Sequence, residues 1–177
     1  TEAAGPRYVS VLAGGQNLFT SLNDNGLIVG YTSSVSTNPL NGDITFGPRN
    51  SFVYNANTDT VLESLPGFTA TDINNAGSVV GIMDGGPLGI LAAQWRNGAA
   101  VNLNSVTSNL GVYTLMQAID INGSGQILAI ARVTPGSVPA NYTGPALRTF
   151  LLSECARCGQ IKPYPIAAGD TLDVGLD

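Results

Sequence analysis

The sequence predicts an all-β protein made of three four-stranded antiparallel repeat units, and its composition and one recurring motif carry this prediction. Short apolar runs rich in Val, Ile and Leu alternate with turn-forming residues, which include 22 Gly and 10 Pro in 177 residues. Only 11% of the residues are charged. Runs of β-branched residues bounded by Gly, Pro and Asn clusters are typical of short strands joined by turns.

The recurring motif reads as an apolar residue, Asn, two small or polar residues, Gly and then an aliphatic strand. Its copies are Leu22–Tyr31, Ile73–Ile82 and Ile121–Ile130. Their turn residues are Asn23 and Gly26, Asn74 and Gly77, and Asn122 and Gly125. The glycines are 51 and 48 positions apart. Because Asn and Gly tolerate a positive φ and Asn bonds its own backbone, each copy predicts a hairpin whose second strand follows the Gly.

The other strands of the unit also recur in a fixed order. An aromatic-bearing third strand is predicted at Ser51–Tyr54, Ala93–Trp95 and Thr149–Leu152. A return strand is predicted at Thr60–Leu65, Ala100–Leu103 and Gln160–Ile166. The units therefore cover approximately residues 16–65, 66–104 and 112–166 of one repeat domain that spans residues 1–177.

Three further segments lie between or beside these strands. A fourth copy of the return strand occurs at Arg7–Leu12, so the three units have a surplus edge strand, and the acidic tail 167–177 is an extra strand or a free end. Loops rich in Gly, Pro, Ser and Asn are predicted between the second and third strands at Thr32–Arg49, Met83–Ile90 and Arg132–Ala146. Loops that share one position in every repeat lie on one face, so we expect binding there.

The middle unit resembles a known repeat. Its segment Ala70-Thr-Asp-Ile-Asn-Asn-Ala-Gly-Ser-Val-Val-Gly81, followed by Ala93-Gln-Trp95 and Gly98, is similar to the extracellular HAF repeat family, which is named for a His-Ala-Phe tripeptide. The resemblance covers nearly the whole chain in three degenerate units, although the tripeptide itself is lost. It implies a secreted or cell-surface location and a repeat architecture, and it implies no common enzymatic activity.

Four-stranded units of this length suggest β-propeller blades, in which neighbouring sheets bury one another's faces. Propellers typically close with about four or more blades. Three units therefore predict an open β-array, a half-ring that dimerises, or a chain whose spare strand pairs with a neighbour. An unpaired edge strand is a template for another chain, so self-association into a filament or a closed oligomer is expected. A monomeric β-sandwich or barrel is the alternative.

Charge and composition exclude several classes of function. The formal net charge is −5 and the few Lys and Arg are scattered, so we expect no nucleic-acid partner. No apolar run approaches the roughly 20 residues that span a bilayer, so we expect no membrane insertion. The chain has no His, which removes the commonest general base and metal ligand. We therefore expect no enzymatic activity, no cofactor and no metal.

The two cysteines, Cys155 and Cys158, occupy the tip of a predicted hairpin. A thioredoxin-type site needs its first Cys at a helix N-terminus, and a zinc site needs two more ligands. A local disulfide is therefore favoured, with intermolecular pairing, redox chemistry or a shared metal as alternatives. Together with the low charge, the pair indicates an oxidising, extracellular setting.

Scattered carboxylates are the only groups that suggest hydrolytic or calcium chemistry. The candidates are Asp24, Asp43, Asp72, Asp84 and Asp120. No copy of the turn reaches the carboxylate density of known calcium loops, and paired carboxylates for glycoside hydrolysis would have to meet in space. Structural turns and a solvated surface are the favoured interpretation.

Tyr31, Tyr113 and Tyr142 lie in or beside the predicted loops and are the candidate ligand-contacting residues. The aromatic residues at core-facing strand positions are Phe52, Tyr54, Trp95 and Phe150. The sequence thus predicts a non-enzymatic extracellular structural or adhesive repeat protein that self-associates through strand pairing between subunits. The alternative is a secreted binding module that recognises a glycan or a protein with its inter-strand loops.

Overall fold

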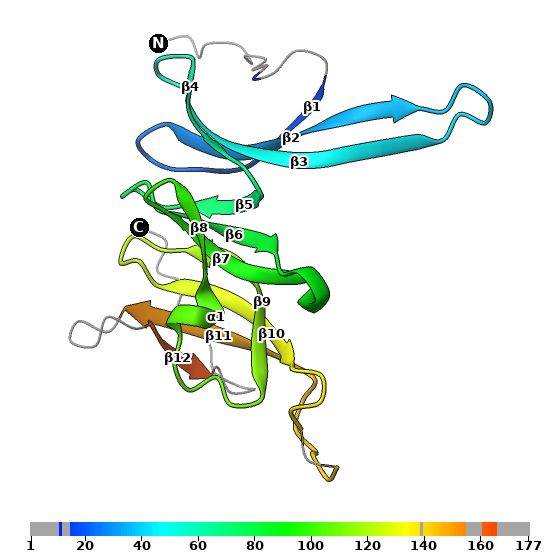
Figure 1. The fold of residues 1–177 in the computed structure, drawn as a ribbon. Helices are drawn as coiled ribbons and strands as arrows, with labels where there is room; N and C mark the ends of the chain where they lie inside the picture. The colour runs from blue at the N-terminus through cyan, green and yellow to red at the C-terminus, as the bar shows by residue number, and fades with distance from the viewer. Residues whose placement is uncertain (1–10, 12–14, 139, 155–160, 166–177) are drawn as a thin grey trace.

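The computed structural model describes residues 11, 15–138, 140–154 and 161–165, and within these residues the chain is all-β. Its strands form three four-stranded antiparallel sheets, and in each sheet the strands lie side by side in chain order. Figure 1 shows the sheets stacked one beside the next, also in chain order. Every sheet is therefore made from one continuous stretch of the chain.

We name the sheets A, B and C from the N-terminus. Sheet A contains β1 (Gly15–Leu22), β2 (Leu27–Thr37), β3 (Ile44–Asn55) and β4 (Thr60–Leu65). Sheet B contains β5 (Phe68–Ile73), β6 (Val79–Asp84), β7 (Ile90–Arg96) and β8 (Ala99–Asn102). Sheet C contains β9 (Tyr113–Ile121), β10 (Ile127–Val133), β11 (Leu147–Glu154) and β12 (Ile161–Pro165). A 3₁₀ turn, η1 (Gly86–Leu88), joins β6 to β7, and a short helix, α1 (Leu103–Val106), follows β8.

The first three strands of every sheet pair in one register. One set of directly opposed residues is Leu22, Ile28 and Tyr54 in sheet A, Ile73, Val79 and Trp95 in sheet B, and Ile121, Ile127 and Leu152 in sheet C. A second set is Phe19, Gly30 and Phe52, then Ala70, Gly81 and Ala93, then Ala118, Ala129 and Phe150. We call residues that share a place in these sets equivalent.

A β-bulge interrupts the first strand of each sheet at an equivalent place. The extra residue is Thr20 in β1, Thr71 in β5 and Ile119 in β9. A bulge bends the strand and redirects the side chain of the extra residue. The consequence for contacts between sheets is described with the site below.

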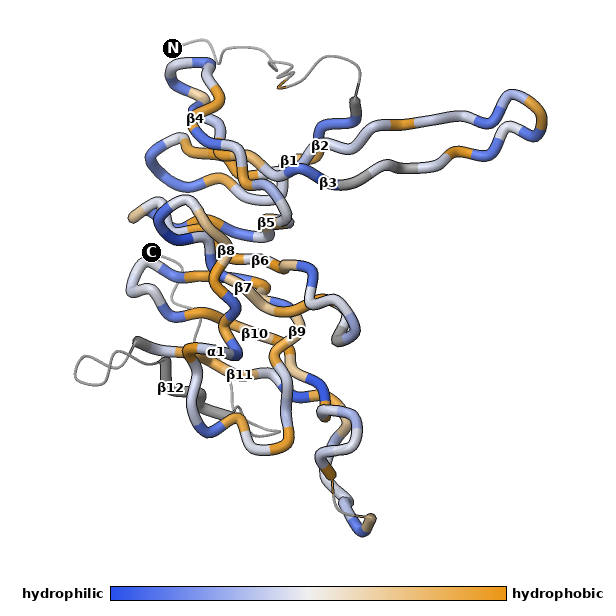
Figure 2. The backbone as a smooth tube through the Cα atoms, in the orientation of Figure 1, coloured by the Kyte–Doolittle hydropathy of each residue, from blue (hydrophilic) through white to orange (hydrophobic). Residues whose placement is uncertain are grey.

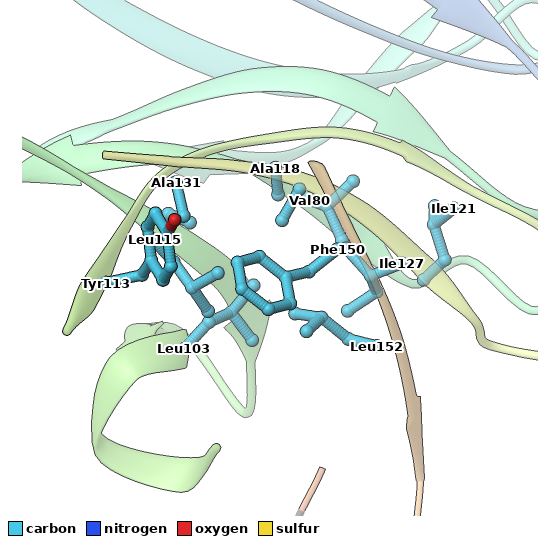
Figure 3. Packing of buried hydrophobic residues seen from close by; sticks show 12 residues of the cluster. Val80, Leu103, Tyr113, Leu115, Ala118, Ile121, Ile127, Ala131, Phe150 and Leu152 are labelled. Atoms are coloured by element: carbon cyan, nitrogen blue, oxygen red, sulfur yellow. The ribbon is translucent and has the colours of Figure 1, made fainter. Parts of the chain in front are cut away.

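Two apolar clusters fill the spaces between the sheets. The cluster between A and B contains Val29, Val53, Leu65, Phe68, Ala70, Ile73, Val79, Ala93 and Trp95. The cluster between B and C surrounds Phe150 and includes Leu103, Leu115, Ile127 and Leu152 (Figure 3). Successive strand residues point to opposite faces, so Val79 packs toward sheet A and Val80 toward sheet C. Sheet B is therefore buried on both faces.

The first predicted loop, Thr32–Arg49, is wrong, because most of this segment is paired strand. β2 and β3 stay paired as far as Thr37 and Ile44, and they project from the stack as a two-stranded arm (Figure 1). The arm is mostly polar along its length (Figure 2). Its Thr, Val and Ile residues favour extended backbone, and this preference outweighs the Gly, Pro and Asn that mark the segment as a loop. Leu40, at the tip of the arm, is 93% exposed.

The predicted return strand Ala100–Leu103 ends early. β8 stops at Asn102, whose side chain accepts a hydrogen bond from the N–H of Asn104 and so caps α1. Leu103, the first helical residue, is fully buried in the cluster between B and C. The helix thus contributes Leu103 to that cluster.

Some predicted features fall outside the described residues. These are Cys155 and Cys158, the tail 167–177 and, apart from Val11, the surplus strand Arg7–Leu12.

Candidate functional site

The three Asn-and-Gly turns share one geometry. In each, the Asn Oδ1 atom accepts hydrogen bonds from the backbone N–H groups two and four positions later, at 2.9–3.1 Å. Each turn glycine has a positive φ of 73–78°. This is an Asx-type turn, in which the side chain replaces a backbone acceptor. The Oδ1 atom closes the turn, and the side-chain NH2 group is left for another partner.

That NH2 group binds the next sheet. Asn23 Nδ2 donates to the backbone oxygen of Asn74 at 2.8 Å, and Asn74 Nδ2 donates to the backbone oxygen of Asn122 at 3.0 Å. The partners are 51 and 48 positions apart, which is the spacing of the sequence motif. We call Asn23, Asn74 and Asn122 the asparagine ladder. The motif spacing predicted the turns, but it did not predict that their side chains join consecutive sheets.

The bulges supply a second contact of the same kind. The Thr20 hydroxyl lies 3.2 Å from the backbone oxygen of Ala70, and the Thr71 hydroxyl lies 2.7 Å from that of Ala118. Each hydroxyl also faces a backbone oxygen of its own sheet, so one donor is shared between two sheets. In sheet C the equivalent residue is Ile119, which has no hydroxyl. The series of contacts therefore stops at sheet C.

Sheets A and B are also joined at the turn surface. The N–H of Asp24 donates to Asn75 Oδ1 at 2.9 Å, and Asn75 Nδ2 donates to Asp24 Oδ2 at 2.6 Å. Asn25 Nδ2 adds a bond to the backbone oxygen of Asn75 at 2.8 Å. The residue equivalent to Asn75 in sheet C is Gly123, which has no side chain to make such contacts.

Two of the candidate carboxylates meet at the junction of sheets B and C. Asp72 and Asp120 share a hydrogen bond between their side chains. Asp72 also accepts from the Ser21 hydroxyl at 2.5 Å and from the N–H of Ile121 at 2.7 Å. These bonds place Asp72 in contact with all three sheets.

The two carboxyl groups differ in their tendency to ionise. Burial alone would raise the pKa of Asp72, but hydrogen bonds from Asp120, Ser21 and two backbone amides outweigh it and lower the pKa. The pKa of Asp120 is raised by its hydrogen bond to Asp72, by partial burial and by the charge of that neighbour. These opposite shifts favour Asp120 as the donor and Asp72 as the acceptor in their shared hydrogen bond. Since the oxygens of Asp72 already accept from groups of the chain, we interpret the pair as a structural contact between sheets.

The other candidate carboxylates do not join this pair. Asp24 bonds the neighbouring turn, Asp43 lies in the arm, and Asp84 accepts a bond from the N–H of Gly86. Within residues 15–138, 140–154 and 161–165, no group of three His, Cys, Asp or Glu side chains forms a possible metal site. The sequence could not show this, because it does not fix which turns face each other.

The outer face of sheet A breaks the burial pattern of the other two sheets. Leu22 is 64% exposed, whereas the equivalent Ile73 and Ile121 are each 4% exposed. Phe19 is 36% exposed, although the equivalent Ala70 and Ala118 are fully buried. The side chains of this face point away from sheet B, because their strand neighbours Val29 and Val53 point toward it. The face also includes Phe52 and Tyr54, which are buried.

Sheet C ends the stack on the opposite side. Asn122 is exposed, whereas Asn23 and Asn74 are buried, and its Nδ2 atom donates to Gln126 of the same turn at 2.8 Å. Leu128 is half-buried, whereas the equivalent Val29 and Val80 are fully buried. Among the described residues, the positions that bind the next sheet in A and B therefore face no further sheet in C.

Two of the predicted ligand-contacting tyrosines lie together near the end of the third insertion. The hydroxyl oxygens of Tyr113 and Tyr142 are 2.5 Å apart, and this hydrogen bond raises the pKa of Tyr142. The guanidinium of Arg148 lies 5.2 Å from the centre of the Tyr113 ring. These side chains and residues 109–112 line an open hollow of about 340 Å³.

Tyr31 lies elsewhere. It belongs to strand β2, and the guanidinium of Arg49 lies 4.6 Å from the centre of its ring. Tyr31 does not border a loop, because the segment that follows it is paired strand and begins the arm.

The fold and these contacts define a class of protein, an all-β chain of stacked antiparallel sheets that hydrogen-bond to one another through their turns. Comparison with protein-family models gave no match, and searches of curated proteins and of solved structures gave none. In the described part of the chain, no helix is long and apolar enough to cross a membrane.

Proposed function

We propose that the chain is a non-enzymatic extracellular structural or adhesive protein that self-associates. The observation that carries the proposal is the asparagine ladder, together with its unfinished end. The polar residues of the turns hydrogen-bond one sheet to the next, which is a structural role. Leu22 is left exposed at one end of the stack and Asn122 at the other.

The architecture that fits this proposal is an open array of three repeats of one propeller-blade-like unit. It is supported by the shared register of the sheets and by contacts between residues 51 and 48 positions apart. The resemblance to the extracellular HAF repeat family supports the same architecture and a location outside the cell. A disulfide between Cys155 and Cys158 belongs to this proposal.

Self-association is tested with the purified full chain at neutral pH and modest salt. Light scattering over a concentration series should show a mass above that of one chain, and negative-stain electron microscopy should show rings or fibres. A monodisperse monomer at every concentration would remove the basis of this function.

A second function, glycan binding, is favoured by the hollow beside Tyr113. Aromatic rings with hydroxyl and guanidinium groups at the rim are suited to stack on a sugar ring and to bond its substituents. Tyr142 and Arg148 provide these groups at the hollow. A glycan array with the wild-type chain and the Arg148→Ala variant tests this function, with Arg49→Ala as the control because Arg49 lines a different hollow. Binding that Arg148→Ala leaves unchanged would argue against this site.

A further inference from the structure

We infer that the outer face of sheet A binds the outer face of sheet C of a second copy of this chain, and that this contact repeats the asparagine-ladder step of the junctions inside the stack. The inference rests on the proposed self-association and specifies its geometry. It assigns the contact to the faces of the end sheets. The sequence had predicted contact through the edge of a surplus strand.

The sheet A end carries the apolar part of the contact. Inside the stack, the residues equivalent to Leu22 and Phe19 are covered by the preceding sheet, and in sheet A they are exposed. An exposed Leu and Phe side by side lose apolar contact that their equivalents have. A sheet packed against the outer face of sheet A would restore this apolar contact. Within the chain, sheet A covers sheet B in this way, and sheet B covers sheet C.

The sheet C end carries the polar part. Asn122 has the same turn geometry as Asn23 and Asn74, but its Nδ2 atom bonds Gln126 within its own turn. If the Asn122 NH2 group donated instead to a backbone oxygen of a turn in another copy, the ladder would extend by one step. Leu128, half-buried on the same face, takes the place that Val29 and Val80 hold at the two internal junctions.

The two ends are complementary in hydrogen bonding. At each internal junction, the earlier sheet supplies an Asn NH2 group and the later sheet supplies the turn oxygen of its own Asn. Sheet C of one copy supplies Asn122 Nδ2, and sheet A of the next copy supplies the backbone oxygen of Asn23. Asp120 would lie beside Ser21 of that copy, as Asp72 lies beside Ser21 within one chain. This junction therefore repeats the step of the asparagine ladder but not the bulge contact, because Ile119 of sheet C has no hydroxyl.

The contact is heterologous, since it joins two different surfaces. Such a contact closes into a ring when the rotation per copy allows it and otherwise grows into a fibre. Two copies closed by two such junctions would place six sheets around a centre, within the range of about four to eight blades found in propellers. A second copy of the chain is thus the partner that fits the end faces.

The test compares Leu22→Glu with a matched control, Leu40→Glu. Both residues are exposed leucines, but Leu40 is at the tip of the arm, away from both end faces. Sedimentation velocity of the full chain should show the assembled species for wild type and for Leu40→Glu, and loss of that species for Leu22→Glu. Circular dichroism checks that each variant is folded. If fibres form, substoichiometric Leu22→Glu should shorten them, because its sheet C end still binds and its sheet A end does not.

A cross-link tests the alignment independently. In a background that carries Cys155→Ser and Cys158→Ser, mild oxidation of mixed Ser21→Cys and Asp120→Cys chains should give a disulfide-linked heterodimer. Thr45→Cys in place of Ser21→Cys should not. If the wild-type chain assembles but Leu22→Glu assembles equally well, contact between the end faces is wrong and self-association through another surface stands. If the wild-type chain is a monomer throughout, the inference and the proposed function both fail.

Discussion

The junction between sheets A and B and the junction between sheets B and C have the same core of hydrogen bonds and different additions. Both contain one step of the asparagine ladder and one bulge threonine. The A–B junction adds the reciprocal contact of Asp24 with Asn75 at the exposed turn surface. The B–C junction adds α1, whose Asn104 bonds both the N–H and the backbone oxygen of Leu115, at 2.7 and 2.9 Å.

The comparison separates the contacts that recur at both junctions from those made at one junction. The shared contacts come from residues at equivalent positions, whereas each addition comes from a residue with no counterpart at the other junction. The B–C junction also has the larger apolar cluster. We therefore expect the two junctions to depend equally on the contacts that they share and unequally on the additions.

The largest effect should come from truncating a fully buried leucine at each junction. Leu115→Ala and Leu65→Ala should each lower the free energy of unfolding by about 2 to 5 kcal/mol. Leu115→Ala should cost more, because Leu115 belongs to the larger cluster. Urea unfolding followed by tryptophan fluorescence measures both, and a larger loss for Leu65→Ala would reverse our ranking of the junctions.

The ladder is probed by replacing its amides with carboxylates. Asn→Asp keeps the acceptor that closes the turn and removes the NH2 donor. Asn23→Asp and Asn74→Asp should each cost about 1 to 3 kcal/mol, because the new carboxylate oxygen is buried without a donor and faces a backbone oxygen. Asn122→Asp is the matched control, because its NH2 group is exposed and bonds only within its own turn. Equal losses for all three variants, measured by urea unfolding of the dilute chain, would mean that the contact between sheets contributes little.

The two local additions should differ in their effect on stability because their hydrogen bonds are buried to different extents. Asn104→Ala removes two partly buried bonds to one strand and should cost about 1 to 2 kcal/mol. Asn75→Ala removes exposed bonds and should cost less than about 1 kcal/mol. Amide hydrogen exchange at β9 and at the first turn localises each effect, and Asn75→Ala should leave β9 unchanged.

The smallest effect concerns pH at the Asp72–Asp120 pair. The raised pKa of Asp120 contributes stability that is present below its unfolded pKa and is lost as pH rises through its folded pKa. The lowered pKa of Asp72 contributes stability that is present above its unfolded pKa and is lost as pH falls through its folded pKa. The pair is therefore most stabilising at acidic pH, between the two folded values.

Asp120→Asn keeps a hydrogen-bond donor at every pH, so it should remove the loss of stability above the pKa of Asp120. Thermal unfolding of wild type and variant from acidic to neutral pH measures this, with Asp43→Asn in the arm as the control. A variant whose melting temperature follows the wild-type pH profile would show that Asp120 does not donate to Asp72.

The sequence predicted the features that depend on local residue types. Asn23, Asn74 and Asn122 predicted hairpin turns because Asn-and-Gly turns are set within a few residues. The sequence could not predict the destination of the Asn NH2 groups, because that depends on how sheets face each other. The pair of Asp72 and Asp120 was missed for the same reason, since contact between residues 48 positions apart requires the stack.

Two local predictions failed through competition between signals. In Thr32–Arg49 the turn-forming residues mask a β-branched pattern, and pairing of two strands decided the outcome. At Leu103 the apolar residue extended the predicted strand, but the preceding Asn102 is a strong helix cap and begins α1. A rule that tests each apolar residue for a cap just before it would have found the helix.

The chain-order arrangement of the strands has a consequence for how the protein acquires its structure. Each sheet pairs only strands that are neighbours in sequence, so its loops close over short stretches of chain. Proteins dominated by such local pairings fold faster than those that join distant segments. A chain delivered from its N-terminus can complete sheet A while sheet C is still being made, and sheet B, buried on both faces, then adds to an existing surface. We expect assembly of the stack to be vectorial, with every new sheet using the previous one as its template.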